Sequence, residues 1–461
     1  MKWITRRAVR WPACAFRQAV ELLFPWYPFL HSRQLAILVG WFCLFLVLGR
    51  WSAWADGLRA GVAEIDITPT LPVILAGYES RTNLSQGVHD PLSARAVAFE
   101  QNGQRLVLLS IDNLGFYNGT ADPLRKAILE ACRLKPSALF MCAIHTHSAP
   151  TLTLNAEKGH ANNVAYTKTL QGKLAAVVEQ ALGRLAPVQI GVGSGSSPVG
   201  VNRRQVVQDT AGKSKIILGR NPSVMTDREV QVLKLARADR NELVAVLFVY
   251  ATHSTSLGPK NYIVSGDIHG LAAQFLEKYL GPGVVAPEFA GASGNIDPWV
   301  RVLPEFRTNN GWVPEPVLMG TMLGEEVARV LDGIQTAAMN GPIKTLFSTI
   351  ELPGKSRGET QASANLPAPL NISVGRVGDI AFVGLGGEVF NELGQTIKSA
   401  SPFRYTLVFT HCNGAGGYVP TQPSYTEGGY EVQSSRFAPG AGEQLAEEAV
   451  RLLQKLKDDR D

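Results

Sequence analysis

The chain of 461 residues has 44 Lys and Arg against 39 Asp and Glu, a formal net charge of +5, with 45% hydrophobic and 18% charged residues. This composition excludes a disordered chain, and five cysteines are too few for a disulfide scaffold. Residues 1–55 hold seven basic residues against Glu21 alone, a net charge of +6 that leaves −1 for the rest. The rest of the chain is therefore nearly neutral, and we expect no nucleic-acid partner.

The N-terminal segment has the layout of an export signal. Residues 34–49 (QLAILVGWFCLFLVLG) are uncharged and mostly apolar, follow a basic stretch, and precede Ala53-Trp54-Ala55. This run is shorter than the roughly 20 residues of a membrane span. We interpret residues 1–55 as a signal peptide, or as a retained membrane anchor within 34–54, which would place residues 56–461 in a periplasmic or secreted location. We expect Cys132, Cys142 and Cys412 to be buried apolar fillers.

The rest of the chain alternates between apolar strand-like runs and helical patterns. The predicted strands are 105–111, 138–144, 188–193, 244–251, 284–290, 379–385 and 405–410. The predicted helices are 121–134, 165–184, 270–280, 322–336, 388–400 and 441–457. This alternation predicts an α/β fold of mainly parallel or mixed buried sheets with flanking helices. The polar segment 353–368 is expected to be a surface loop or a boundary between two lobes.

A strand–helix–strand unit recurs three times, and its strands end in polar clusters. The first runs from Leu106 through Asp112 to His145-Thr146-His147-Ser148, the second from Val244 through His253 to Gly294-Asn295-Ile296-Asp297, and the third from Ile380 through Glu388 to His411-Cys412-Asn413 and Tyr418. Ligands of open α/β sheets bind beyond the carboxyl ends of strands. We therefore predict one composite site at these strand ends.

Three of these residues are candidates for binding a metal. At i, i+2 spacing in extended backbone, His145 and His147 would face the same side, which suits two ligands or one ligand and an acid/base. His253 follows an apolar strand and is either a hydrogen-bonded structural histidine or a ligand. Asp267, at a helix start, is either an N-cap or a residue that orients a ligand histidine.

Other polar residues also have two readings. Glu388 follows two glycines at a strand–helix junction, although an acid in a first helical turn is favoured without any function. Arg203 would bind an oxyanion or be a solvated charge, and Tyr418 and Tyr430 lie in a Gly-rich loop typical of a substrate rim. Two histidines and one carboxylate from three strand ends make a plausible open Zn²⁺ site. The sequence contains no G-x-S-x-G elbow, Walker A motif or dinucleotide fingerprint.

The order of the motifs resembles the catalytic domain of the neutral/alkaline (non-lysosomal) ceramidase family. The motifs are AGVAEIDITPT (60–70), GVHDPLSARA (87–96), IHTHSAP (144–150), VNRR (201–204), ATHS (251–254), SGDIHG (265–270), GASGNIDP (291–298), GGE (386–388) and GYVP…GGYE (417–431). Each motif is weak alone, but their joint order and spacing are specific.

The resemblance implies a zinc site and a set of residue roles. It implies His145, His253, Glu388 and Tyr418 as the metal ligands. It implies that His147 assists proton transfer or holds the carbonyl, and that Arg203 and Tyr430 contact the substrate and its developing oxyanion. Family members usually carry a serine in a GDVSPN-type segment, where this chain has Asp297, so we expect no seryl nucleophile and an added negative charge. We also expect a short form without the family's C-terminal immunoglobulin-like domain.

The function implied by the resemblance is zinc-dependent hydrolysis of an N-acyl amide by a metal-activated water. The substrate would be lipid-like: ceramide, cleaved to sphingosine and fatty acid, or a related N-acyl amine. Two alternatives stay open, namely a non-catalytic metal-binding receptor or sensor and a metal-dependent esterase or phosphoesterase. The last would need a second metal and more carboxylates, for which Asp112, Asp267 and Asp297 are the candidates.

Overall fold

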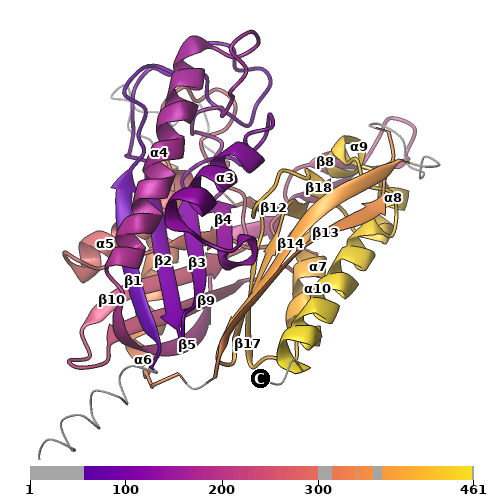
Figure 1. Ribbon diagram of the computed structural model, residues 1–461. Coiled ribbons are helices and arrows are strands. Elements are labelled where there is room, and N and C mark those ends of the chain that lie inside the picture. The colour runs from indigo at the N-terminus through magenta and orange to yellow at the C-terminus, as the bar shows by residue number, and fades with distance from the viewer. Residues whose placement is uncertain (1–56, 300–313, 340, 357–365, 459–461) are drawn as a thin grey trace, which may run out of the picture. The chain divides into compact units, whose positions relative to one another are not determined.

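The larger of two sheets is mixed and runs across the unit Gly57–Asp461 (Figure 1). The computed structural model describes residues 57–299, 314–339, 341–356 and 366–458. Within them, eight strands pair in the order β11-β10-β9-β5-β1-β2-β3-β4. Their bounds are β1 Arg59–Asp66, β2 Ser93–Gln101, β3 Gln104–Ile111, β4 Leu139–Ala143, β5 Ala186–Ser196, β9 Glu229–Arg237, β10 Leu243–Tyr250 and β11 Glu288–Ala290.

The second sheet has the order β13-β14-β15-β17 within the described ranges. Its strands are β13 Ile343–Pro353, β14 Pro367–Val377, β15 Ile380–Leu385 and β17 Tyr405–Phe409. Short two-stranded ladders complete the β structure: β6 Gly200–Asn202 with β12 Ile296–Pro298, β7 Arg204–Gln208 with β8 Ser214–Leu218, and β16 Glu388–Val389 with β18 Tyr418–Val419.

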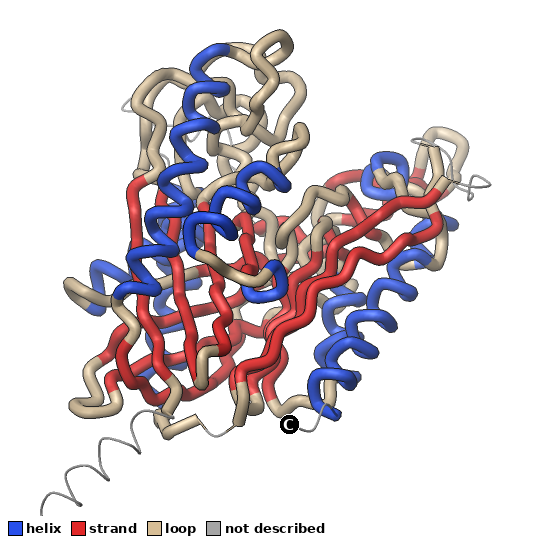
Figure 2. Tube along the Cα trace, in the orientation of Figure 1, coloured by secondary structure: helices blue, strands red, loops and turns tan. Residues whose placement is uncertain are grey.

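Helices cover the outer faces of the two sheets, as the blue segments of Figure 2 show. They are α3 Ala121–Cys132, α4 Ala161–Gly183, α5 Asp267–Leu280, α6 Pro314–Gly333, α7 Asn391–Ala400, α8 Gln422–Glu427, α9 Tyr430–Ser434 and α10 Ala441–Asp458, with a 3₁₀ turn η2 Pro136–Ala138. Helices α3 to α6 pack on one face of the large sheet, and α7 and α10 pack on the second sheet.

Side-chain alternation explains this layering. In β2, Ala94 and Ala96 pack toward the helices, whereas Val97 and Phe99 face the second sheet. The second sheet contributes Phe382 and other apolar residues to the same inter-sheet core. Strands buried on both faces read as nearly continuous apolar runs, which is why strands such as β3, β4 and β10 are visible in the sequence.

The mixed form of the predicted α/β fold is confirmed, and its parallel pairs carry the three predicted units. β3 pairs with β4, β10 with β11, and β15 with β17 in parallel, each across a helix. Some boundaries differ from the predictions. The predicted strand 284–290 is reduced to Glu288–Ala290, and the predicted helix 388–400 begins at Asn391 because Glu388 belongs to β16.

The segment 353–368 joins two paired strands and does not separate two lobes. β13 and β14 pair in antiparallel register up to Pro353 opposite Pro367. The described ends of this segment therefore belong to one hairpin, and residues 357–365 lie outside the described residues.

The predicted leader, residues 1–55, lies outside the described part of the chain. Among the described helices, none is long and apolar enough to span a membrane. Cys132, Cys142 and Cys412 are buried and form no disulfide, as expected of apolar fillers.

Candidate metal centre

Backbone hydrogen bonds join the segments that follow the parallel strands. The segment after β4 meets the segment after β10, because His147 N donates to Ser254 O at 3.1 Å. Gly294 N donates to Val389 O at 2.9 Å, and a Cβ at Gly294 would lie 2.5 Å from Glu388 O. Only glycine allows this close approach. The three strand-end segments therefore meet at one place, as the sequence predicted.

His145 occupies a strained backbone conformation at the end of β4. Its φ of 60° lies in the left-handed region, so the expectation of extended backbone is wrong at this residue. Its Nδ1 lies 2.7 Å from Leu114 O, and a carbonyl can only accept, so Nδ1 carries the proton. The Nε2 of His145 then presents a lone pair, and the ring is fixed in orientation.

His253 is held in the same way from the opposite segment. Its Nδ1 lies 2.8 Å from Ser293 O and 3.0 Å from Ile296 O, both acceptors. Its Nε2 is buried and has no hydrogen-bond partner among the described residues. A histidine whose Nδ1–H is bound to a carbonyl and whose Nε2 is left open has the usual arrangement of a metal ligand.

Glu388 completes the convergence. Its Oε2 lies 3.4 Å from His145 Nε2 and 3.5 Å from His253 Nε2, and it too lacks a hydrogen-bond donor among the described residues. Two imidazole lone pairs thus face one carboxylate oxygen. When both rings are neutral, no proton lies on either Nε2, so no hydrogen bond joins these atoms. Two of these atoms, His253 Nε2 and Glu388 Oε2, are buried without a hydrogen-bond partner among the described residues, which is unfavourable. A bound cation would satisfy both and would also accept the lone pair of His145 Nε2. The donor set therefore fits a divalent metal.

The electrostatics favour the ligand forms of these groups. Burial alone would raise the pKa of Glu388, but the facing imidazoles of His145 and His253 outweigh it and hold that pKa well below the ordinary value. Burial, with the nearby charge of Arg203, lowers the pKa of His253. The carboxylate is thus ionised and the imidazole neutral near pH 7, as metal binding requires.

His147 lies at the open side of this group. Its Nε2 is 3.3 Å from His145 Nε2, and nitrogen atoms of His145, His147 and His253 all lie within 4.8 Å of one another. His147 is half-buried, unlike His145 and His253, and its Nδ1 has no hydrogen-bond partner in the described ranges. Burial, followed by the neighbouring imidazole of His145, lowers the pKa of His147 well below the usual value. The histidine cluster therefore permits either a third imidazole ligand or a proton carrier at this position.

Tyr418 reaches the centre beside Glu388. The two residues are opposite each other in the β16–β18 ladder, and the Tyr418 ring stacks 6.4 Å from that of His253. The Tyr418 hydroxyl accepts a hydrogen bond from Arg203 Nη2 at 3.0 Å. Burial raises the pKa of Tyr418 well above its ordinary value, and Arg203 offsets this only partly. Tyr418 is thus adjacent to the predicted ligands as a neutral phenol, and its role as a ligand stays a prediction.

Arg203 and Tyr430 occupy very different environments. Arg203 is buried, and besides Tyr418 it donates to Asp297 Oδ1 at 3.1 Å and Glu431 Oε1 at 2.8 Å, so it is not a solvated charge. Tyr430 is 46% exposed, and its ring lies 5.6 Å from that of Tyr418. It therefore stands at the rim of the site.

The remaining candidate carboxylates lie outside the histidine cluster. Asp112 pairs with Arg95 at 3.2 Å, and burial raises its pKa to about 7. Asp267 accepts hydrogen bonds from Ser256 Oγ and from Ile268 N, so it anchors the segment after His253. These placements give the phosphoesterase alternative no support.

The negative charge of Asp297 is neutralised by two neighbouring arginines. The residue is fully buried and pairs with Arg203 at 3.1 Å and with Arg220 at 3.2 Å. The expected extra negative charge is therefore balanced by two guanidinium groups.

Two residues of the site, Tyr117 and Glu431, were not predicted, and His411 was predicted at a strand end without any assigned role. Tyr117 donates to Glu388 Oε1 at 2.8 Å, His411 stacks on His145 with ring centroids 3.9 Å apart, and Glu431 bridges Arg203 and Arg204. Tyr117 and His411 both follow apolar strands. The strand-end rule that identified His145 also placed His411 in a predicted cluster, and it could have found Tyr117.

We expect Tyr117→Phe to weaken metal binding about tenfold, because Glu388 loses the donor that orients it. Competition with a chromogenic chelator measures this affinity. Tyr425→Phe is the matched control, since its hydroxyl donates to Phe437 O at 2.6 Å in a different part of the chain. Equal metal affinities for Tyr117→Phe and the unaltered protein would contradict the orienting role.

Comparison with known families identifies the family of the chain. Residues 58–295 match the model of the neutral/alkaline non-lysosomal ceramidase N-terminal domain. The chain belongs to this ceramidase family. The matched region contains His145, His147, Arg203 and His253, whereas Glu388 lies beyond it.

Individual ceramidases are similar over part of their length. The chain is 25% identical to the neutral ceramidase of Oryza sativa over 258 residues, 52% of this chain and 31% of that protein. It is 26% identical to the neutral ceramidase of Pseudomonas aeruginosa over 286 residues, 57% of this chain and 40% of that protein. The matched stretches thus span well under half of these relatives.

Solved structures show the same fold. The crystal structure of the Pseudomonas aeruginosa neutral ceramidase superposes with a TM-score of 0.69 at 19% identity, covering 87% of this chain and 75% of that one. A ceramidase complexed with C2 superposes with a TM-score of 0.70 at 18% identity and the same coverage.

Proposed function

We propose that this ceramidase-family protein hydrolyses an N-acyl amide with zinc held by His145, His253, Glu388 and Tyr418. The observation that carries the proposal is the convergence of His145 Nε2 and His253 Nε2 on Glu388 Oε2, at 3.4 Å and 3.5 Å. Both rings direct Nδ1 at carbonyl oxygens, which leaves each Nε2 with a lone pair. Zinc in such a site lowers the pKa of water to about 7 and polarises a carbonyl. The substrate class we propose is ceramide or a related N-acyl amine.

The surrounding residues supply positioning and proton transfer. His147 is the half-buried histidine of the cluster, and its lowered pKa keeps the ring neutral and able to accept a proton near pH 7. Arg203 directs its guanidinium at Tyr418 and is fixed by Asp297 and Glu431. A preorganised buried cation of this kind stabilises negative charge on a substrate oxygen. Tyr430, at the exposed rim, would contact the bound substrate.

A metal-binding sensor on the same scaffold is the second candidate. It is favoured by Asp297, which stands where related ceramidases carry a serine and pairs with Arg203. Arg203 already donates to Asp297, Glu431 and Tyr418, so it has few N–H groups left to donate to a substrate. We also propose residues 1–55 as an export signal or membrane anchor, and residues 56–461 as the catalytic domain.

The experiment is a hydrolysis screen with purified protein. N-acylsphingosines of short and long acyl chain, simple N-acyl alkylamines and the matching esters are offered, and released fatty acid is measured. We expect amide hydrolysis, reduced at least about a hundredfold in His147→Gln, which keeps a polar side chain but transfers no proton. Metal-loaded protein that cleaves esters but no amide would overturn the proposal, and protein that cleaves neither would favour the sensor.

A further inference from the structure

A second cavity lies apart from the metal centre. It measures about 1060 Å³ and is bounded by the β7–β8 hairpin and helices α7, α8 and α10. Arg204 lines this cavity, whereas its neighbour Arg203 contacts Tyr418 of the centre. The buried carboxylate of Glu431 lies between the two arginines and accepts from both, at 2.8 Å and 2.9 Å. The cavity is therefore separate from the proposed active site.

One part of the cavity wall is apolar. Val206 and Ile216 of the hairpin face it, together with Leu393 of α7 and Val450 of α10. Leu393 is buried, but Val206 is 54% exposed, so apolar surface remains open to a ligand. Burial of this surface by an alkyl chain would be favourable, at about 25 cal/mol per Å².

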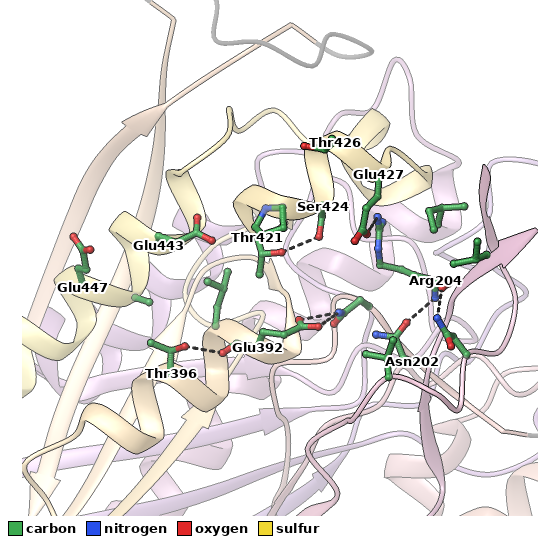
Figure 3. Close-up of a pocket in the computed structure, with 18 of the residues that line it drawn as sticks. Asn202, Arg204, Glu392, Thr396, Thr421, Ser424, Thr426, Glu427, Glu443 and Glu447 are labelled. Atoms are coloured by element: carbon green, nitrogen blue, oxygen red, sulfur yellow. Dashed lines mark hydrogen bonds and ion pairs between the residues drawn. The ribbon is translucent and has the colours of Figure 1, made fainter. Parts of the chain in front are cut away.

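Carboxylates without a basic partner line the same cavity. Figure 3 shows Glu443 and Glu447 on one side, Glu392 between, and Arg204 with Glu427 on the opposite side. No ion pair joins Glu392, Glu443 or Glu447 to a basic residue of the described chain. Glu443 Oε2 is buried and has no hydrogen-bond partner there.

Most basic residues of the cavity wall form ion pairs with acidic residues of the chain. Arg204 pairs with Glu427 and Glu431, and Arg451 pairs with Glu448. Lys215, exposed on β8, is the remaining basic residue of the lining. An anionic ligand would thus meet an excess of carboxylates, whereas a cationic one would be attracted by them. Glu392 already accepts from Asn295 and Glu443 from Gln422 N, but neither bond brings a positive charge.

We propose that this cavity binds a long-chain ammonium ion, with its charged group at Glu443 and Glu447 and its alkyl chain along the apolar wall. A cavity of this size can hold a ligand of that class. Under the proposed function, and resting on it, such an amine is the kind of product released from an N-acyl long-chain amine. The binding itself requires only the cavity, its carboxylates and its apolar wall.

The test is calorimetric titration of the metal-loaded full chain with decylamine, decanoate and decanol, each below its critical micelle concentration. We expect decylamine to bind with a stoichiometry near one and decanoate to show no comparable affinity. Glu443→Gln combined with Glu447→Gln is expected to weaken decylamine binding about tenfold. Glu325→Gln combined with Asp332→Asn, on exposed positions of α6, removes the same charge elsewhere and is expected to change nothing.

Two further variants locate the binding. Val206→Ser is expected to weaken binding through the apolar wall. Because Val206 is 54% exposed, we expect the substitution to change the stability of the fold little. His253→Ala is expected to bind decylamine normally, which excludes coordination of the amine at the metal centre. Decanoate binding as tightly as decylamine, or unchanged affinity in the Glu443/Glu447 double variant, would overturn the proposal. No substrate is present, so failure of the proposed hydrolysis would not affect this result.

Discussion

The His253→Ala variant is expected to bind metal more than about one hundred times more weakly than the unaltered protein. This loss is larger than the loss expected when a group that only orients a ligand is removed. His253 Nε2 faces Glu388 Oε2 at 3.5 Å without any other partner in the described structure. Alanine removes this lone pair and leaves Glu388 Oε2 facing His145 alone, while Tyr117 still donates to Glu388 Oε1. Metal content after dialysis, measured by mass spectrometry, and chelator competition give the stoichiometry and the affinity.

His160→Ala is the matched control for this variant. His160 is exposed and caps α4, where its Nδ1 accepts from Asn162 N at 3.2 Å. Its loss should lower stability by about 1 kcal/mol, as for other caps, and leave metal binding intact. Normal metal affinity in His253→Ala would mean that His253 is a structural histidine, the alternative that the sequence left open.

The Asp297→Asn variant is expected to lower the free energy of unfolding by about 3 kcal/mol. Asp297 is fully buried between Arg203 and Arg220, and the amide would leave two cations facing each other. This loss of stability lies at the lower end of the range for breaking a buried ion pair. Arg203 keeps Glu431 as a partner, and the Arg220 side chain is 19% exposed to water. Urea unfolding followed by circular dichroism measures the change.

Asp379→Asn is the control for removal of an ion pair. Asp379 pairs with Lys457 at 3.1 Å, but its side chain is 62% exposed, so the change should stay below about 1 kcal/mol. Asp297→Ser introduces the residue type that the family resemblance leads us to expect at this position. It removes the same charge, so we expect it to be destabilised like Asp297→Asn. If Asp297→Ser were as stable as the unaltered protein, the arginine pairing would not explain the presence of Asp297.

The sequence located the site because one topological rule governs it. The apolar runs that end at Asp112, His145 and His253 are strands of parallel pairs, and parallel strands bring their carboxyl ends to the same edge. The antiparallel strands β1, β2, β9, β13 and β14 were not predicted. Their residues are less continuously apolar, and partners such as β1 and β5 lie far apart in the chain.

The contacts that tune the site could not be predicted from spacing. The left-handed backbone of His145 and the stacking of His411 on its ring depend on tertiary packing between distant segments. The substitution at Asp297 was visible in the sequence, but its neutralisation by Arg220 depends on a side chain 77 residues away. Burial and pairing of charges are properties of the folded chain, so residue type alone did not give the electrostatics.

The most direct test of the central claim is the metal content of the purified full chain, measured on the same preparation as its amide hydrolysis. We predict about one zinc per chain in active protein, loss of both zinc and activity on chelation, and return of both when zinc is added. A fully active preparation that contains no metal would contradict the account.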